Sequence, residues 1–187
     1  MLITAIPYCP NGKGSPPGRD IGHSCNLFYE RCLQENDWGC VLDHDIAMVT
    51  PKWTEIVETA IATQIDAGCF TFKLSKAPPG SRWQVASGVD SRRHDLPYHV
   101  DIANREMQVI HTSIDVTENE KLPGGYALSG LMVIQKKTWN AVGGFPSGAK
   151  FVDWGMHSKI RSYGLKVYLL PQIYAYHWGK GNVYPSY

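Results

Sequence analysis

The sequence lacks an excess of charge of either sign. Its 187 residues include 18 basic and 17 acidic side chains, which leaves a formal net charge of +1 at pH 7. Proteins that bind nucleic acid through a broad basic face carry a marked surplus of lysine and arginine. The balance of charge therefore argues against nucleic acid as a partner.

Long hydrophobic runs are missing as well. No stretch approaches the roughly 20 apolar residues that a membrane-spanning helix needs, so we expect no membrane span. The first residues, 1–7, have neither the basic start nor the long apolar core of a signal peptide. We therefore expect a cytoplasmic protein.

Paired cysteine spacings are also absent. The five cysteines are an odd number, and no two of them form a Cys-x-x-Cys pair of the kind that binds zinc. We expect reduced thiols rather than a disulfide framework, in keeping with a cytoplasmic location. A chain of this length buries roughly 70% of its unfolded surface, so it needs neither disulfides nor a metal merely to fold.

The sequence does contain an alternation of apolar strands and amphipathic helices, which is typical of one α/β domain with a mostly parallel sheet. Asp20 and Thr50 are predicted helix N-caps, and Gly68 is predicted to end the second helix. Pro171 is predicted to end a strand. The predicted strands are 2–6, 38–42, 69–74, 128–134, 165–170 and 174–177, and the predicted helices are 20–34, 50–67, 98–112, 136–142 and 152–163.

The most informative stretch is Asp43-His44-Asp45, which follows the apolar run 38–42. An apolar run that stops at two acids indicates a buried strand delivering carboxylates to its carboxyl end, where open α/β sheets bind ligands. Two carboxylates so close repel each other unless a cation lies near them. Mg²⁺ and Mn²⁺ are suited to such oxygen ligands, so we expect one of them here. The alternative is a solvated pair of acids at a strand–loop junction.

Three segments together resemble the family-2-like glycosyltransferases of the GT-A fold. The first, 19–26 with the strand to Asp45, is similar to that family's Asn-containing helix and DxD motif. The second, 129–145, resembles its glycine-bearing strand, short helix and "vGGF" turn. The third, from Asp153-Trp154 to His177, resembles its acidic helix, the strand that follows and a C-terminal histidine.

The resemblance implies an abbreviated, Rossmann-like GT-A domain with a mixed, mostly parallel sheet flanked by helices. Within the single domain 1–187, it implies a nucleotide- and metal-binding part at 1–74, a variable acceptor-side excursion at 75–125, and a donor-sugar and acceptor part at 126–187. The nucleotide part is shorter than in full members of the family, and only one of the family's two acids before the tryptophan is present.

The resemblance also implies roles for individual residues. Asp45 and His177 would bind the metal, and Asp43 would contact the ribose or a metal-bound water. Asp153 would be the general base if transfer inverts the anomeric centre, or would orient the acceptor if it retains it. Cofactor-binding candidates are Arg19, paired with a phosphate, Asn26 on the family's helix, and Gly130, which leaves space for the donor sugar.

The function that follows is transfer of a sugar from a nucleotide-diphosphate donor to a hydroxyl acceptor. A UDP-sugar is the expected donor, a saccharide or another hydroxyl compound the acceptor, and Mn²⁺ or Mg²⁺ the cofactor. Two rivals stay open at this point. The chain could bind a nucleotide-sugar or carbohydrate without turnover, or it could be a metal-dependent phosphoesterase that uses the same acids.

Overall fold

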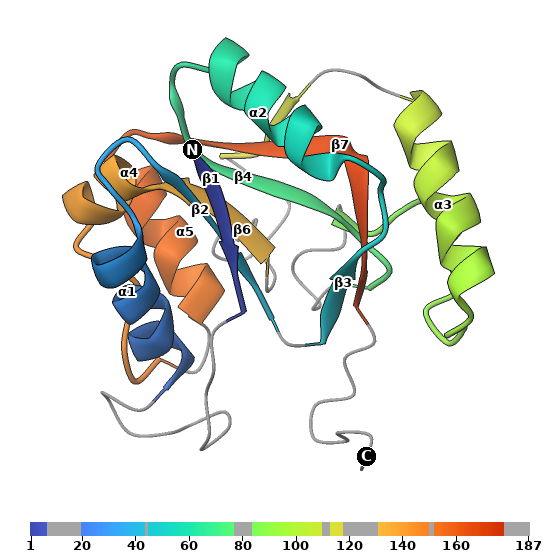
Figure 1. Cartoon of the computed structure of the whole chain (residues 1–187), viewed down its shortest axis with the longest axis horizontal. Coiled ribbons are helices and arrows are strands. Elements are labelled where there is room, and N and C mark those ends of the chain that lie inside the picture. Colours follow the sequence, from blue (N-terminus) through green and yellow to red (C-terminus); the bar gives the residue numbers. More distant parts are fainter. Residues whose placement is uncertain are drawn as a thin grey trace.

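Apolar strands pair into one mixed sheet in the computed structural model, which describes residues 1–6, 20–43, 45–76, 84–109, 113–117, 131–149 and 152–177 (Figure 1). Within these ranges the strands are β1 (Leu2–Ala5), β2 (Trp38–Leu42), β3 (Ile46–Met48), β4 (Ala67–Leu74), β5 (Ile114–Asp115), β6 (Leu131–Gln135) and β7 (Lys166–His177). The predicted α/β class is confirmed, and so are most of the predicted strands. The sequence did not predict β3 and β5.

The direction of the strands differs in part from the prediction. The order is β1-β2-β6-β4-β7-β3, with β5 also pairing with β7. Among the described strands, two pairings are parallel, β1–β2 and β4–β7, and four are antiparallel. Most pairs of neighbouring strands are therefore antiparallel, and the prediction of a mostly parallel sheet is wrong in this respect. Strand β6 runs antiparallel to both β2 and β4, and β3 and β5 run antiparallel to β7. The strands β1, β2, β4 and β7 still share one direction, so their carboxyl ends point the same way.

Helices cover both faces of the sheet (Figure 1). The described helices are α1 (Ile21–Cys32), α2 (Trp53–Thr63), α3 (Leu96–Val109), α4 (Lys136–Ala141) and α5 (Val152–Ser162). Side chains of α1, α4 and α5 pack together on one face, whereas α2 packs on the other. Helix α3 lies beside the carboxyl-terminal half of β7 and forms a smaller core with it.

Strand β2 shows how the two cores divide the sheet. Trp38, Cys40 and Leu42 belong to the core beneath α2, and Val41 belongs to the core beneath α1, α4 and α5. Successive side chains of a strand point to opposite faces, so a strand covered on both sides is apolar throughout. All five residues of β2 are buried, as the sequence predicted for 38–42.

Two of the predicted helix boundaries are wrong. Helix α2 begins at Trp53, after Lys52 in the left-handed region (φ 52°), and not at Thr50. The Thr50 hydroxyl is instead 2.8 Å from the backbone nitrogen of Tyr174 on β7 and accepts its hydrogen bond. Gly68 does not end α2 but lies inside β4, where a Cβ would come within 2.9 Å of the Leu165 and Ile160 side chains. Tertiary packing has overridden the local signals in both places.

Strand β7 continues through Pro171, where the sequence predicted an end. Its pairing with β4 shifts register between Phe72 and Lys73, which leaves Pro171 and its neighbours outside the regular ladder. A proline is tolerated at such an irregularity because its missing N–H would have no partner there. Figure 1 shows that β7 bends sharply after crossing the sheet, so one strand provides both of the predicted segments.

The other boundaries are closer to prediction. The side chain of Asp20 caps α1 by accepting a hydrogen bond of 2.8 Å from the backbone nitrogen of His23, as predicted. In the predicted excursion 75–125, Gln84 and Ala86 are buried, so part of its described chain packs into the fold. Within the described ranges, no helix combines the length and the apolar character that crossing a bilayer requires.

Candidate functional site

Asp43 and Asp45 lie in a turn that joins β2 to β3. Strand β2 ends at Leu42, and the backbone nitrogen of Ile46 donates to the carbonyl oxygen of Asp43 at 3.0 Å. Because β2, β4 and β7 share one direction, the turn lies at the edge of the sheet where their carboxyl ends meet (Figure 1). The predicted position of the acids, directly after a buried strand, is confirmed. His44, between them, lies outside the described residues.

The structure brings Asp45 and His177 together. Strand β3 pairs with the end of β7 in a register that sets Ile46 opposite His177. Asp45, one residue before Ile46, therefore reaches the imidazole: its Oδ2 is 3.4 Å from His177 Nε2. The side chains of His177 and Asp45 are only 15% and 17% exposed. Two residues far apart in sequence, both predicted to bind the metal, thus face each other.

The end of β4 holds His177 in place. The Ser75 hydroxyl donates to the His177 carbonyl oxygen at 3.0 Å and accepts from the His177 backbone nitrogen at 2.9 Å. The ring nitrogen Nδ1 lies 3.3 Å from the carbonyl oxygen of Lys76. A carbonyl oxygen only accepts, so a hydrogen bond in this contact requires the proton on Nδ1. The lone pair of Nε2 is then directed toward the Asp45 carboxylate.

This arrangement fits a shared cation. A neutral Nε2 and a carboxylate oxygen are both acceptors, so a proton or a metal ion must lie between them to make the contact favourable. Two ligands about 2.1 Å from one ion and at right angles lie about 3 Å apart, which is close to the observed 3.4 Å. Metal-binding histidines usually donate their other N–H to a carbonyl or carboxylate, as Nδ1 does here.

Asp43 does not join these two residues in a cluster. Within the described parts of the chain, no three His, Cys, Asp or Glu side chains form a group that could hold a metal ion. Among the described residues, Asp45 and His177 are thus the two candidate ligands of an ion at this place, and phosphate oxygens of a substrate could supply others. Two of the three predicted metal ligands meet, and the metal-binding roles of all three stay predictions.

Asn26 on α1 makes three hydrogen bonds to other parts of the fold. Its Nδ2 donates to the Phe145 carbonyl oxygen at 3.0 Å, and its Oδ1 accepts from the Phe145 backbone nitrogen at 2.8 Å and from Trp139 Nε1 at 3.0 Å. A Cβ on Gly144 would lie 2.8 Å from the same oxygen. Asn26 therefore fastens α1 to the Gly143-Gly144-Phe145 turn, and its predicted contact with a cofactor stays a prediction.

Asp20 fastens the next part of that loop. In addition to capping α1, its Oδ2 accepts from the Ser147 hydroxyl at 2.9 Å and from the Gly148 backbone nitrogen at 2.6 Å. Burial raises the pKa of Asp20, but these hydrogen bonds and that from His23 outweigh it and leave the pKa below its usual value. A Cβ on Gly22 would lie 2.3 Å from the Pro146 carbonyl oxygen, so the loop also packs directly on α1.

Asp153 lies in the first turn of α5, as predicted. Its Oδ1 accepts a hydrogen bond from the Trp154 backbone nitrogen at 2.9 Å. A short turn at Gly164 joins α5 to the start of β7, and the two elements pack together. Helix α5 consequently runs antiparallel to β7, so it begins near the carboxyl ends of β1, β2, β4 and β7. Its first turn and the turn at Asp43 thus lie toward the same end of the sheet (Figure 1).

Two predicted residues, Arg19 and Gly130, lie outside the described residues. The exposed Arg92 and Arg93 are described, and each makes a two-point ion pair with a nearby acid, Asp90 and Asp95 respectively. These two arginines therefore lie in a solvated loop, paired with their own neighbours.

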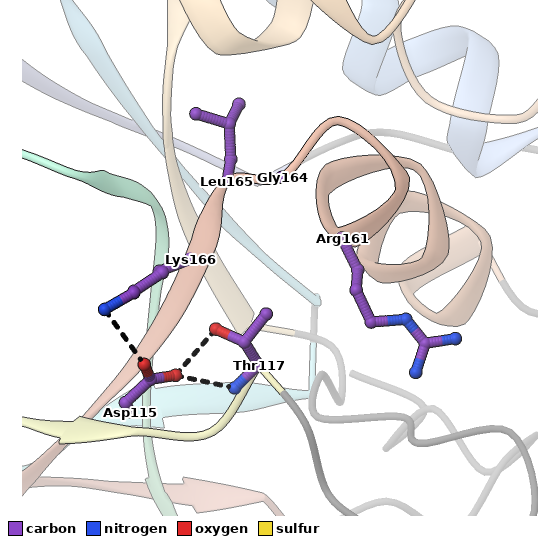
Figure 2. A pocket seen from close by; sticks show the side chains of 6 residues that line it. All are labelled: Asp115, Thr117, Arg161, Gly164, Leu165 and Lys166. Carbon is purple, nitrogen blue, oxygen red and sulfur yellow. Dashed lines mark hydrogen bonds and ion pairs between the residues drawn. The ribbon is translucent and has the colours of Figure 1, made fainter.

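A pocket lies at the opposite end of β7 from the candidate site (Figure 2). Its volume is about 360 Å³. Figure 2 shows Arg161 pointing away from Lys166, whose ammonium group forms ion pairs with Asp115 at 3.4 Å and Asp66 at 3.1 Å. Hydrogen bonds and charge from these acids raise the pKa of Lys166 well above its usual value. The residues that line the pocket are Asp115, Thr117, Arg161, Gly164, Leu165 and Lys166.

Sequence reasoning missed Ser75 and the carbonyl of Lys76. A polar residue directly after the apolar run 69–74 was the available signal, but a serine there is also an ordinary strand end. No protein-family model and no curated protein matches the chain. The family resemblance therefore stays a prediction from the sequence.

Proposed function

We propose that the protein is a metal-dependent glycosyltransferase that moves a sugar from a nucleotide-diphosphate donor, with a UDP-sugar as the first candidate, to a hydroxyl acceptor. The observation that carries the proposal is the approach of Asp45 to His177 at 3.4 Å, at the edge of the sheet where parallel strands end. Diphosphates and divalent ions are commonly bound at such edges.

The donor set favours Mn²⁺ over Mg²⁺. Magnesium is bound mostly through oxygen, whereas an imidazole beside a carboxylate suits a softer ion. Such an ion, when bound, stabilises as a Lewis acid the negative charge that develops on the departing diphosphate. Asp45 and His177 would hold it, and Asp43 would contact the ribose or a bound water.

Asp153 is the proposed base for an inverting transfer. Its carboxylate would take the proton of the acceptor hydroxyl while that oxygen bonds to the anomeric carbon and the bond from this carbon to the diphosphate breaks. The position of α5 supports this role, because its first turn lies toward the end of the sheet where the Asp43 turn is found. In a retaining transfer, Asp153 would orient the acceptor instead.

The proposal is tested by thermal unfolding with a panel of nucleotide-sugars, each with and without Mn²⁺. A ligand at 100 times its Kd stabilises the folded state by about 2.7 kcal/mol. We expect a Mn²⁺-dependent rise with at least one donor, and its loss in Asp45→Asn. The matched control is Asp101→Asn at an exposed position on α3, which should keep the rise. No metal-dependent response to any donor would remove the support for this function.

Product analysis separates the rival functions. A transferase releases the nucleoside diphosphate and glycosylates the acceptor, whereas a phosphoesterase cleaves on the phosphate side of the anomeric oxygen and releases a sugar phosphate. Asp153→Asn should abolish transfer and keep donor binding. Donor binding without turnover in the unaltered protein, over the whole acceptor panel, would favour a non-catalytic binding protein.

A further inference from the structure

The buried Ser75 hydroxyl forms hydrogen bonds with both backbone polar groups of His177. Ser75, which is 1% exposed, directly follows β4, and its backbone nitrogen donates to the Ala175 carbonyl oxygen at 3.1 Å. Its hydroxyl then bonds to both backbone polar groups of His177, at 3.0 and 2.9 Å. A single side chain thus continues the β4–β7 ladder by one rung, and that rung is the one that carries the imidazole.

The next residue sets the direction of the ring. The carbonyl oxygen of Lys76 lies 3.3 Å from His177 Nδ1, and Asp45 faces the other nitrogen at 3.4 Å. Lys76 follows Ser75 directly, so the position of its carbonyl relative to the ring depends on where Ser75 fastens the two strands. Without the hydroxyl, the two backbone groups of His177 would lose this partner, and the end of β7 could move relative to Lys76.

We propose that Ser75 is a positioning residue that orients His177 so that Nε2, and not Nδ1, is offered to a divalent cation shared with Asp45. The part that concerns a cation rests on the proposed function. The part that concerns the ring rests on contacts among Ser75, Lys76 and His177 alone. Groups that orient a metal-binding histidine typically contribute 10- to 100-fold to metal affinity.

Thr50 provides a matched control, because its hydroxyl contacts the backbone of β7 at Tyr174, three residues before His177. Thr50, which is 2% exposed, also accepts from a backbone nitrogen of β7 and lies near the carbonyl of the same residue, Tyr174, at 2.8 and 3.5 Å. The backbone nitrogens of Val49 and Thr50 donate to the Tyr174 carbonyl as well, so the strand pairing does not depend on the hydroxyl. Ser75→Ala and Thr50→Val therefore each remove one buried hydroxyl that contacts the backbone of β7. Only in Ser75→Ala is the lost contact at His177.

Two measurements test the proposal on these variants. The first is Mn²⁺ binding with the metal alone, followed by the electron paramagnetic resonance signal of free Mn²⁺. Ser75→Ala should weaken binding about 10- to 100-fold, and Thr50→Val should leave it unchanged. The second is the nitrogen NMR spectrum of the His177 ring without metal. In the unaltered protein and in Thr50→Val, Nδ1 should carry a hydrogen-bonded proton, and in Ser75→Ala this signal should weaken or give way to a mixture of tautomers.

The outcomes separate the two proposals. If Ser75→Ala keeps both the Mn²⁺ affinity and the ring spectrum, the positioning role is overturned while the metal site stands. If the unaltered protein does not bind Mn²⁺ alone and gives no Mn²⁺-dependent response to any nucleotide-sugar, the metal site and the proposed function fail, and the ring spectrum alone then decides whether Ser75 orients His177. Equal losses of affinity in Ser75→Ala and Thr50→Val would also overturn the proposal, since they would show a general loosening of β7.

Discussion

Replacing Asn26 by alanine tests whether this residue braces the fold or binds a ligand. Asn26 makes three hydrogen bonds, two to the Phe145 backbone and one to the indole of Trp139. Each such bond contributes about 1 kcal/mol, and buried partners left unpaired add to the loss. We therefore expect Asn26→Ala to lower the free energy of unfolding by about 3 kcal/mol.

The assay is urea unfolding followed by tryptophan fluorescence. For a chain of this size, a loss of about 3 kcal/mol corresponds to a decrease in Tm of roughly 6–12 °C, so thermal unfolding gives an independent check. The matched control is Asn140→Ala, because Asn140 is exposed on the neighbouring helix α4. A substitution at an exposed position of this kind usually changes stability by less than about 0.5 kcal/mol.

The result that would refute the structural role is specific. A loss of stability below about 1 kcal/mol, together with weaker nucleotide-sugar binding, would show that Asn26 contacts the ligand after all. Asn26→Asp adds a second check. It keeps an oxygen that can accept from Phe145 N and Trp139 Nε1, but it sets an oxygen against the Phe145 carbonyl where Nδ2 now donates. It should therefore destabilise the fold as well.

Three further predictions concern the same region. Asp20→Ala should cost about 2 kcal/mol at pH 7, from the lost cap and the lost bonds to the 147–148 loop. The pKa of Asp20 is lowered in the fold. The difference in unfolding free energy between the two proteins is therefore complete above the unfolded pKa of about 3.9 and should vanish as the pH falls through the folded pKa. Urea curves that give the same difference at every pH would contradict this. Gly144→Ala should cost more than Gly143→Ala, because both have φ above 70° but only at Gly144 would a Cβ meet neighbours, and equal decreases in Tm would contradict this. Tyr29→Phe should cost about 1–2 kcal/mol, since its hydroxyl lies within 3.1 Å of two buried carbonyl oxygens, and a urea midpoint unchanged from the unaltered protein would argue against it.

The sequence predicted the elements well where local signals and packing agree. The run 38–42 became a strand buried on both faces, and Asp20 became a cap. It could not predict the direction of β6, because a strand that is apolar on both faces has no feature in its sequence that distinguishes parallel from antiparallel pairing. Thr50 and Gly68 misled for another reason. Their signals as cap and stop are real, but contacts with β7 and α5 use the threonine hydroxyl and the space at the glycine instead.

In the candidate site, too, residue types could be predicted from the sequence, whereas their arrangement in space could not. Metal binding by Asp45 and His177 is predicted from residue type and from the family resemblance, and it stays a prediction. Their meeting depends on the unpredicted strand β3, whose register sets Ile46 opposite His177. A shift by one residue would send every side chain of such a strand to the other face. The sequence next to Asp45 and the sequence next to His177 do not indicate how β3 and β7 pair.

The register at the site is fixed by the elements on both sides of β7. On one side, the backbone nitrogens of Val49 and Thr50 donate to the Tyr174 carbonyl, which holds β3 in place. On the other side, the Ser75 hydroxyl fastens His177 to the end of β4. A histidine held from both sides has little freedom to reorient, so an ion that binds here meets a ligand already in position. The cost of ordering that ligand has then been met during folding, which would favour binding of the proposed ion at Asp45 and His177.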